Sequence, residues 1–114
     1  MSDCLFCKII NKTIPSTAVY EDEFVYAFKD INPVAPVHVL IVPKQHIANV
    51  NDIDASNAKY LIDIHLAAKK ITEELGIKDS GYRLINNCGS DGGQTVFHLH
   101  YHLIGGKNLG LNLL

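Results

Sequence analysis

Apolar and polar positions alternate in short runs along most of the chain, and these runs predict strands. Residues 17–22 and 24–30 are rich in β-branched and aromatic residues and are separated by an acidic turn. Residues 37–43 are apolar on both faces except at His38. Two later runs, 81–86 and 96–104, complete a set of five predicted strands, of which the last is the longest.

One long helix is predicted over residues 56–75, between the third and fourth strands. Its apolar residues recur in steps of three and four and form one stripe: Leu61, Ile64, Ala68, Ile71 and Leu75. Gly76 follows, where a helix stop is expected. Residues 4–10 predict a short N-terminal helix. Only the step across the long helix suits a βαβ crossover, so we expect an α+β fold, with a mainly antiparallel sheet packed against that helix.

Length and composition indicate a globular protein with one domain over residues 1–114. The net charge is −2 and no basic cluster is present, which argues against a nucleic-acid partner. The apolar runs are too short to span a membrane, and no signal peptide precedes them, so we expect a cytoplasmic protein with no membrane partner. Three cysteines, an odd number, favour reduced thiols or metal ligands over a disulfide framework.

Three histidines occupy every second position of the last predicted strand. Because side chains alternate along a strand, His98, His100 and His102 are expected on one face, with Phe97 and Leu99 on the opposite, core face. The pattern allows three interpretations: a polar strand face, a metal chelate, or nucleophilic catalysis by imidazole. A glycine-rich loop and a hydroxyl, residues 88–95, come directly before it and suggest an anion held over the imidazoles.

The segment "HLHYHLI" resembles the defining motif of the histidine triad (HIT) family of nucleotide hydrolases and transferases. Three longer stretches, "CLFCKIINKTIPS", "DINPVAPVHVLIVPKQHI" and "GYRLINNCGSDGGQTVFHLHYHLIGG", resemble the Hint branch in the same order and with similar spacing. The resemblance implies a single HIT domain, a HIT-like fold and a homodimer. It also implies hydrolysis of purine-nucleoside phosphoramidates or acyl-adenylates, with an AMP-type ligand, through a covalent nucleotidyl-histidine.

The same resemblance implies roles for individual residues. His100 is the expected nucleophile, His102 and Thr95 are expected to hold the phosphate oxygens, and His38 is expected in the wall of the active site. The remaining substrate contacts it implies are the ribose ligand Asp30, the base-pocket residue Ile31, and the phosphate-side residues Asn87, Gly93 and Gln94. From the residues alone, a lone histidine such as His38 is more often a core residue, and a turn is the lesser alternative for Asp30.

Cys4 and Cys7 form a C-x-x-C pair, which alone suits a redox pair, half of a zinc site, or chance. The resemblance to bacterial-type Hint members implies a structural zinc on Cys4, Cys7, His46 and His98. No metal is then needed for the chemistry.

Two rival functions stay open: a dinucleoside polyphosphate hydrolase of the same family, and a non-catalytic nucleotide-binding or scaffold protein. The chain also departs from well-known family members in two places. It contains no tryptophan, whereas well-known eukaryotic members carry one in their C-terminal tail, so their leaving-group preference is not carried over; Thr95 also stands where many members have serine.

Overall fold

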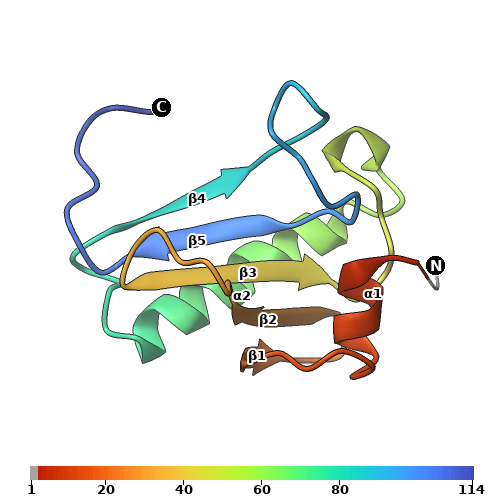
Figure 1. Cartoon of the computed structure of the whole chain (residues 1–114), viewed down its shortest axis with the longest axis horizontal. Helices are drawn as coiled ribbons and strands as arrows, with labels where there is room; N and C mark the ends of the chain where they lie inside the picture. The colour runs from red at the N-terminus through yellow and green to blue at the C-terminus, as the bar shows by residue number, and fades with distance from the viewer. Residues whose placement is uncertain (1–2) are drawn as a thin grey trace.

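One five-stranded antiparallel sheet forms the centre of the computed structural model, which describes residues 3–114 (Figure 1). The elements are α1 (Leu5–Ile10), β1 (Ala18–Glu21), β2 (Val25–Lys29), β3 (Val37–Pro43), the short 3₁₀ helix η1 (Val50–Asp52), α2 (Lys59–Glu74), β4 (Tyr82–Asn86) and β5 (Tyr101–Gly105). The strand order is β1-β2-β3-β5-β4. Both β3 and β4 pair antiparallel with β5, so they run parallel to each other, and α2 is the crossover between them. The predicted α+β class and element order are confirmed.

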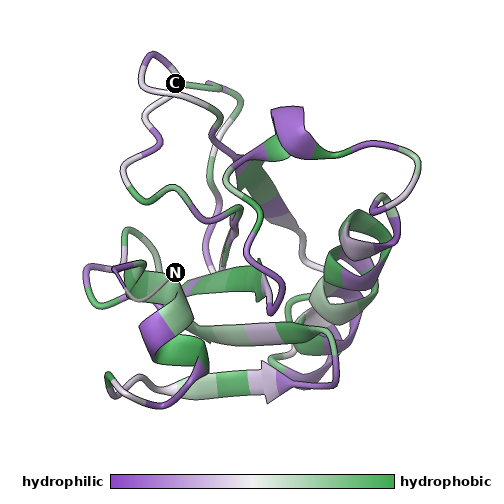
Figure 2. Ribbon diagram, turned by 90° about the vertical axis from the view of Figure 1, so that its right-hand side faces the viewer, coloured by the Kyte–Doolittle hydropathy of each residue, from purple (hydrophilic) through white to green (hydrophobic). Residues whose placement is uncertain are grey.

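The two helices cover opposite faces of the sheet (Figure 2). The α2 face holds one buried cluster: Val25, Ala27, Val39, Ile41, Ile64, Ala67, Ala68, Ile71 and Leu103. The α1 face holds a second: Phe6, Ile9, Tyr26, Phe28, Leu40 and Val42. Successive residues of β2 and β3 therefore alternate between two apolar environments. This explains why the third predicted strand is apolar on both faces.

Helix α2 begins and ends close to its predicted limits. It starts at Lys59 rather than near Ser56, because residues 54–57 form a turn in which the Asp54 carboxylate accepts from the Ser56 N–H at 2.8 Å. At its end Gly76 takes a φ of 73°, and the Ile77 N–H donates to the Thr72 carbonyl at 3.0 Å. This left-handed stop is the expected glycine cap.

The last predicted strand is shorter than expected. Its pairing begins only at Tyr101, opposite Ile41 of β3, although residues 96–104 alternate like a strand. The partner strand β3 ends at Pro43, which has no N–H, and the Leu99 N–H instead donates to the Ile47 carbonyl. Phe97, expected in the core, is 49% exposed.

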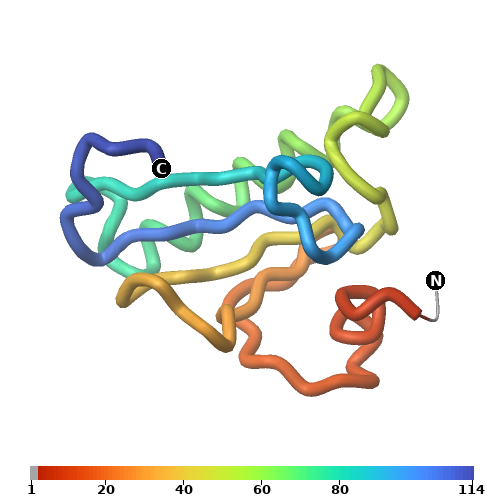
Figure 3. The backbone as a smooth tube through the Cα atoms, turned by 45° about the horizontal axis from the view of Figure 1, so that its top comes forward, coloured from red at the N-terminus to blue at the C-terminus, as the bar shows by residue number. Residues whose placement is uncertain are grey.

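The C-terminal segment is irregular, as predicted, and folds back beside the start of β4 (Figure 3). The Arg83 guanidinium holds it there by donating to the Gly110 and Asn112 carbonyls, at 2.9 and 3.3 Å. Within residues 3–114, neither α helix combines the length and the apolar character needed to cross a bilayer.

Candidate functional site

A cavity of about 860 Å³ lies on the α1 side of the sheet. Its apolar end is lined by residues of α1 and β2, including Phe6, Ile9 and Phe28. Seven residues that sequence analysis singled out also line it: Asp30, Ile31, Asn87, Gly93, Thr95, His100 and His102. The structure therefore brings one acidic group, two imidazoles and a hydroxyl to the same cavity as an apolar wall.

His100 presents an unprotonated ring nitrogen to this cavity. Its Nδ1 lies 2.8 Å from the His98 carbonyl, which can only accept, so Nδ1 carries the proton and Nε2 keeps a lone pair. The amide of Asn86 donates to the His100 carbonyl at 3.0 Å and fixes the main chain. Burial lowers the pKa of His100 below its usual 6.5. A neutral imidazole with a free lone pair is chemically a nucleophile.

His102 presents the opposite form, an N–H. The Val34 N–H donates to His38 Nδ1 at 3.2 Å, so the proton of neutral His38 is on Nε2. His38 Nε2 lies 2.9 Å from His102 Nδ1 and donates to it, which leaves the proton of His102 on its own Nε2. Burial, followed by the nearby His100 and His38, lowers the pKa of His102. Asp30 Oδ2 lies 3.4 Å from His38 Nε2 and borders the same group.

The glycine-rich loop before the histidines is tightly braced. Gly93 has a φ of 85°, and a Cβ on Gly92 would lie 2.5 Å from the Cys88 carbonyl oxygen. The Gln94 amide is buried and accepts from the Gly89 N–H at 2.9 Å. The same amide donates to the Ala48 and Val96 carbonyls at 2.8 and 3.1 Å. Gln94 thus shapes the loop, whereas Thr95 is exposed to the cavity.

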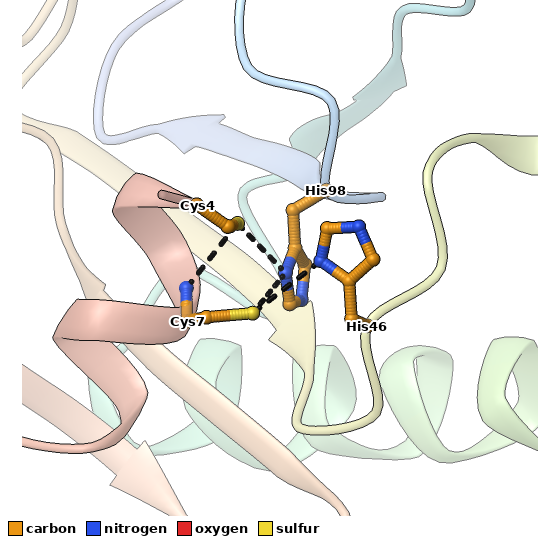
Figure 4. A group of neighbouring side chains, drawn as sticks. All are labelled: Cys4, Cys7, His46 and His98. Carbon is orange, nitrogen blue, oxygen red and sulfur yellow. Dashed lines mark hydrogen bonds between the residues drawn. The ribbon is translucent and has the colours of Figure 1, made fainter. Parts of the chain in front are cut away.

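The second candidate site is the group Cys4, Cys7, His46 and His98 (Figure 4). The four ligand atoms lie within 4.8 Å of one another, and His98 Nδ1 is 3.5 Å from each sulfur. The other nitrogen of His98 donates to the Pro43 carbonyl at 2.8 Å, so its lone pair faces the thiols, as in metal-bound histidines. Two sulfurs and two imidazoles are the ligand set of a closed tetrahedral zinc site. The residues therefore fit a metal ion.

Burial sets the protonation of this group in the metal-free protein. It lowers the pKa of His98 to about 4, which keeps the ring neutral. Burial and the neighbouring Cys4 raise the pKa of Cys7 to about 11, which keeps that thiol protonated. Metal binding must displace this proton, because the thiolate is the ligand.

A further cluster, Asp30, His38 and His102, does not fit a metal ion. In the described chain its ligand atoms also lie within 4.8 Å of one another. However, His38 Nδ1 already accepts the Val34 N–H, so a metal on Nε2 would require the ring to lose its only proton. This cluster is a hydrogen-bond relay.

Two side chains that no sequence pattern singles out hold His100 in place. Phe6 meets its ring edge-on, with centroids 5.0 Å apart, and Asn86 holds its carbonyl. An apolar residue of a short helix is typical of a core position, and an asparagine at a strand end is typical of a turn. Neither pattern signals contact with the triad.

Comparison with known proteins supplies the family. A family model described as HIT domain matches residues 11–109. A purine nucleoside phosphoramidase of Escherichia coli K12 is 48% identical over 108 residues, covering 95% of this chain and 91% of that protein. A solved HIT family hydrolase from Clostridium thermocellum is 64% identical, with a TM-score of 0.98, covering 100% of this chain and 99% of that one. A histidine triad protein from Clostridium difficile is 53% identical, with a TM-score of 0.96, covering 98% and 97% of the two chains.

Proposed function

The chain belongs to the HIT domain family, and from this premise we propose that it hydrolyses the P–N bond of purine-nucleoside phosphoramidates. The observation that carries the proposal is the pair of opposite ring forms in one cavity. His100 offers a lone pair and His102 offers an N–H. Displacement at phosphorus requires both groups together: a nucleophile that attacks the phosphorus and a hydrogen-bond donor to its oxygens.

The first chemical step is attack by His100 Nε2 on the phosphorus of the nucleotide. The P–N bond to the amine breaks as the bond to Nε2 forms, and the amine leaves after taking up a proton from solvent. The His102 Nε2–H and the Thr95 hydroxyl donate to the non-bridging oxygens, where negative charge grows in the transition state. Backbone around Gly93 and the Asn87 amide border the same phosphate.

The second step releases the nucleotide. Water attacks the phosphorus and gives up a proton to solvent, the bond to His100 Nε2 breaks with its electron pair returning to that nitrogen, and AMP leaves the neutral Nδ1–H imidazole. Because Nδ1 stays bonded to the His98 carbonyl throughout, the same nitrogen is free for the next turnover.

The rest of the cavity suits a purine nucleoside. Asp30 is half-buried at the cavity and offers carboxylate oxygens to the ribose hydroxyls. Phe6, Ile9 and Phe28 offer an apolar wall to the base, and Ile31, which is 91% exposed, lies at the mouth. We assign a structural zinc ion to the four residues Cys4, Cys7, His46 and His98, where it ties α1 to the sheet. A homodimer and a cytoplasmic location stay predictions.

The test is a single-turnover reaction with adenosine 5′-phosphoramidate labelled at phosphorus. The unaltered protein should release AMP, and acid quenching at early times should trap label on the protein. His100→Ala should abolish both the trapped label and AMP release. His65→Ala is the matched control, since it removes an exposed imidazole of α2 outside the cavity. Equal rates of AMP release by the unaltered protein and His100→Ala would contradict the assignment of His100 as the nucleophile. Binding of AMP without any turnover would instead favour the nucleotide-binding rival.

A further inference from the structure

Two separate chains of contacts link the cysteine–histidine cluster to the proposed nucleophile, His100. One route runs through the main chain of His98, and the other through α1. Both end on the His100 ring. The cluster formed by Cys4, Cys7, His46 and His98 is called the thiol cluster below.

The first route sets which nitrogen of His100 is free. The His98 side chain is completely buried and held at both nitrogens, by the Pro43 carbonyl on one side and the thiols on the other. The carbonyl of this same residue accepts the Nδ1 proton of His100 at 2.8 Å. A His98 ring fixed by a bound ion therefore fixes the acceptor that selects the nucleophilic form of His100.

The second route sets where the His100 ring lies. Cys4 caps α1, because its sulfur accepts from the Cys7 N–H at 3.4 Å, and both sulfurs belong to the thiol cluster. Phe6 lies between them in sequence and is 4% exposed. Its ring meets His100 edge-on, at 5.0 Å between centroids and 87° between planes. A six-residue helix has little stability of its own, so its position depends on what anchors it.

We infer that the thiol cluster, when it holds a metal ion, positions the nucleophile, and that Phe6 and the His98 carbonyl are the groups that transmit its state. This inference rests on the proposed function and adds a dependence of the chemical step on metal occupancy. A purely structural ion would change only the folded fraction. The positioning role predicts a change in kcat within the folded protein, because small misplacements of a reacting group cost about 10- to 100-fold.

His46→Ala is the variant that separates the two roles. His46 contacts the Cys7 sulfur at 3.3 Å and the His98 ring edge, but it neither lines the cavity nor contacts His100. Its loss weakens metal binding while Phe6 and His98 stay in the chain. The variant is titrated with Zn²⁺ at a temperature well below its metal-free unfolding midpoint, and kcat, KM and unfolding are measured at each point.

We expect kcat to rise about 10-fold or more with zinc occupancy, with a smaller change in KM, although the protein is folded throughout. A kcat that stays constant while only the unfolding midpoint rises would overturn the inference. Phe6→Leu should lower kcat at full zinc occupancy. Ile71→Val, which trims the α2 cluster far from the cavity, is the matched destabilised control and should retain kcat.

A second readout needs no turnover. The ¹⁵N spectrum of the His100 ring, identified by its absence in His100→Ala, reports which nitrogen carries the proton. We expect the Nδ1–H form alone with zinc and a smaller share of that form without it, because the His98 carbonyl is then held less firmly. An unchanged spectrum overturns the positioning role. A changed spectrum in a protein that does not cleave phosphoramidates supports the positioning role and contradicts only the proposed function.

Discussion

The relay from Val34 through His38 to His102 can be broken at one residue. His38→Ala removes the donor to His102 Nδ1, which lies 2.9 Å from His38 Nε2, and leaves that ring nitrogen without its partner. The His102 proton is then free to move to Nδ1. In that form Nε2 has no proton to donate to a phosphate oxygen.

The size of the effect follows from the hydrogen bond that is lost. Leaving a buried acceptor without its donor costs about 1–3 kcal/mol. If this cost is carried into the transition state, kcat/KM falls between about 5-fold and about 150-fold, since each 1.36 kcal/mol is a factor of ten. The effect should be mainly on kcat, because the bond to the phosphate oxygens strengthens as charge develops there.

His38→Gln is the matched variant. A glutamine amide can donate to His102 Nδ1 in place of the imidazole Nε2–H, so this variant should recover much of the lost kcat. Steady-state kinetics with an adenosine phosphoramidate give kcat and KM for the three proteins, and thermal unfolding confirms that each is folded at the assay temperature. If His38→Ala retains full kcat, or if His38→Gln is as poor as His38→Ala, the relay does not hold the proton on His102.

Three further predictions concern the rest of the cavity. Because burial lowers the pKa of His100, protonation removes its nucleophilic lone pair only at more acidic pH, so the acid limb of kcat/KM against pH should have its midpoint below 6.5; a midpoint above 6.5 contradicts this. Thr95→Val should lower kcat about 100-fold, whereas Thr95→Ser keeps the hydroxyl and most of the rate. Gly92→Ala places a Cβ 2.5 Å from the Cys88 carbonyl oxygen, so it should destabilise the protein by about 1–3 kcal/mol and weaken AMP binding, as measured by denaturation and calorimetry.

The parts of the fold that sequence alone predicts are those with a local cause. The apolar stripe of α2 and the glycine at its end are properties of one segment, and the helix lies within a few residues of its predicted limits. The predicted start of the histidine-bearing strand was wrong, because strand pairing depends on the neighbouring strand β3. β3 stops at Pro43, and no local pattern in residues 96–100 indicates that.

The family resemblance named seven of the residues that line the cavity, but it did not indicate the hydrogen bonds among them. The thiol cluster joins Cys7 to His98, 91 residues away, and only the family resemblance linked them. No spacing rule indicates that the Val34 N–H would fix the proton of His38 or that Phe6 would meet His100. Such contacts depend on how side chains pack on main-chain groups in three dimensions, and the spacing of apolar residues along the sequence carries no information about that.

The three triad histidines are the same residue with a different hydrogen-bond partner behind each ring, and this difference gives each ring a different arrangement of proton and lone pair. Behind His98 a carbonyl takes the Nε2 proton, so Nδ1 faces the thiols with a lone pair. Behind His100 a carbonyl takes the Nδ1 proton, so Nε2 faces the cavity with a lone pair. Behind His102 the partner is a donor, His38, so Nε2 faces outward with a proton. A period of two brings the three residues together, but the acceptors and the donor decide which ring turns a lone pair to the thiols, which turns a lone pair to the cavity and which offers the cavity an N–H.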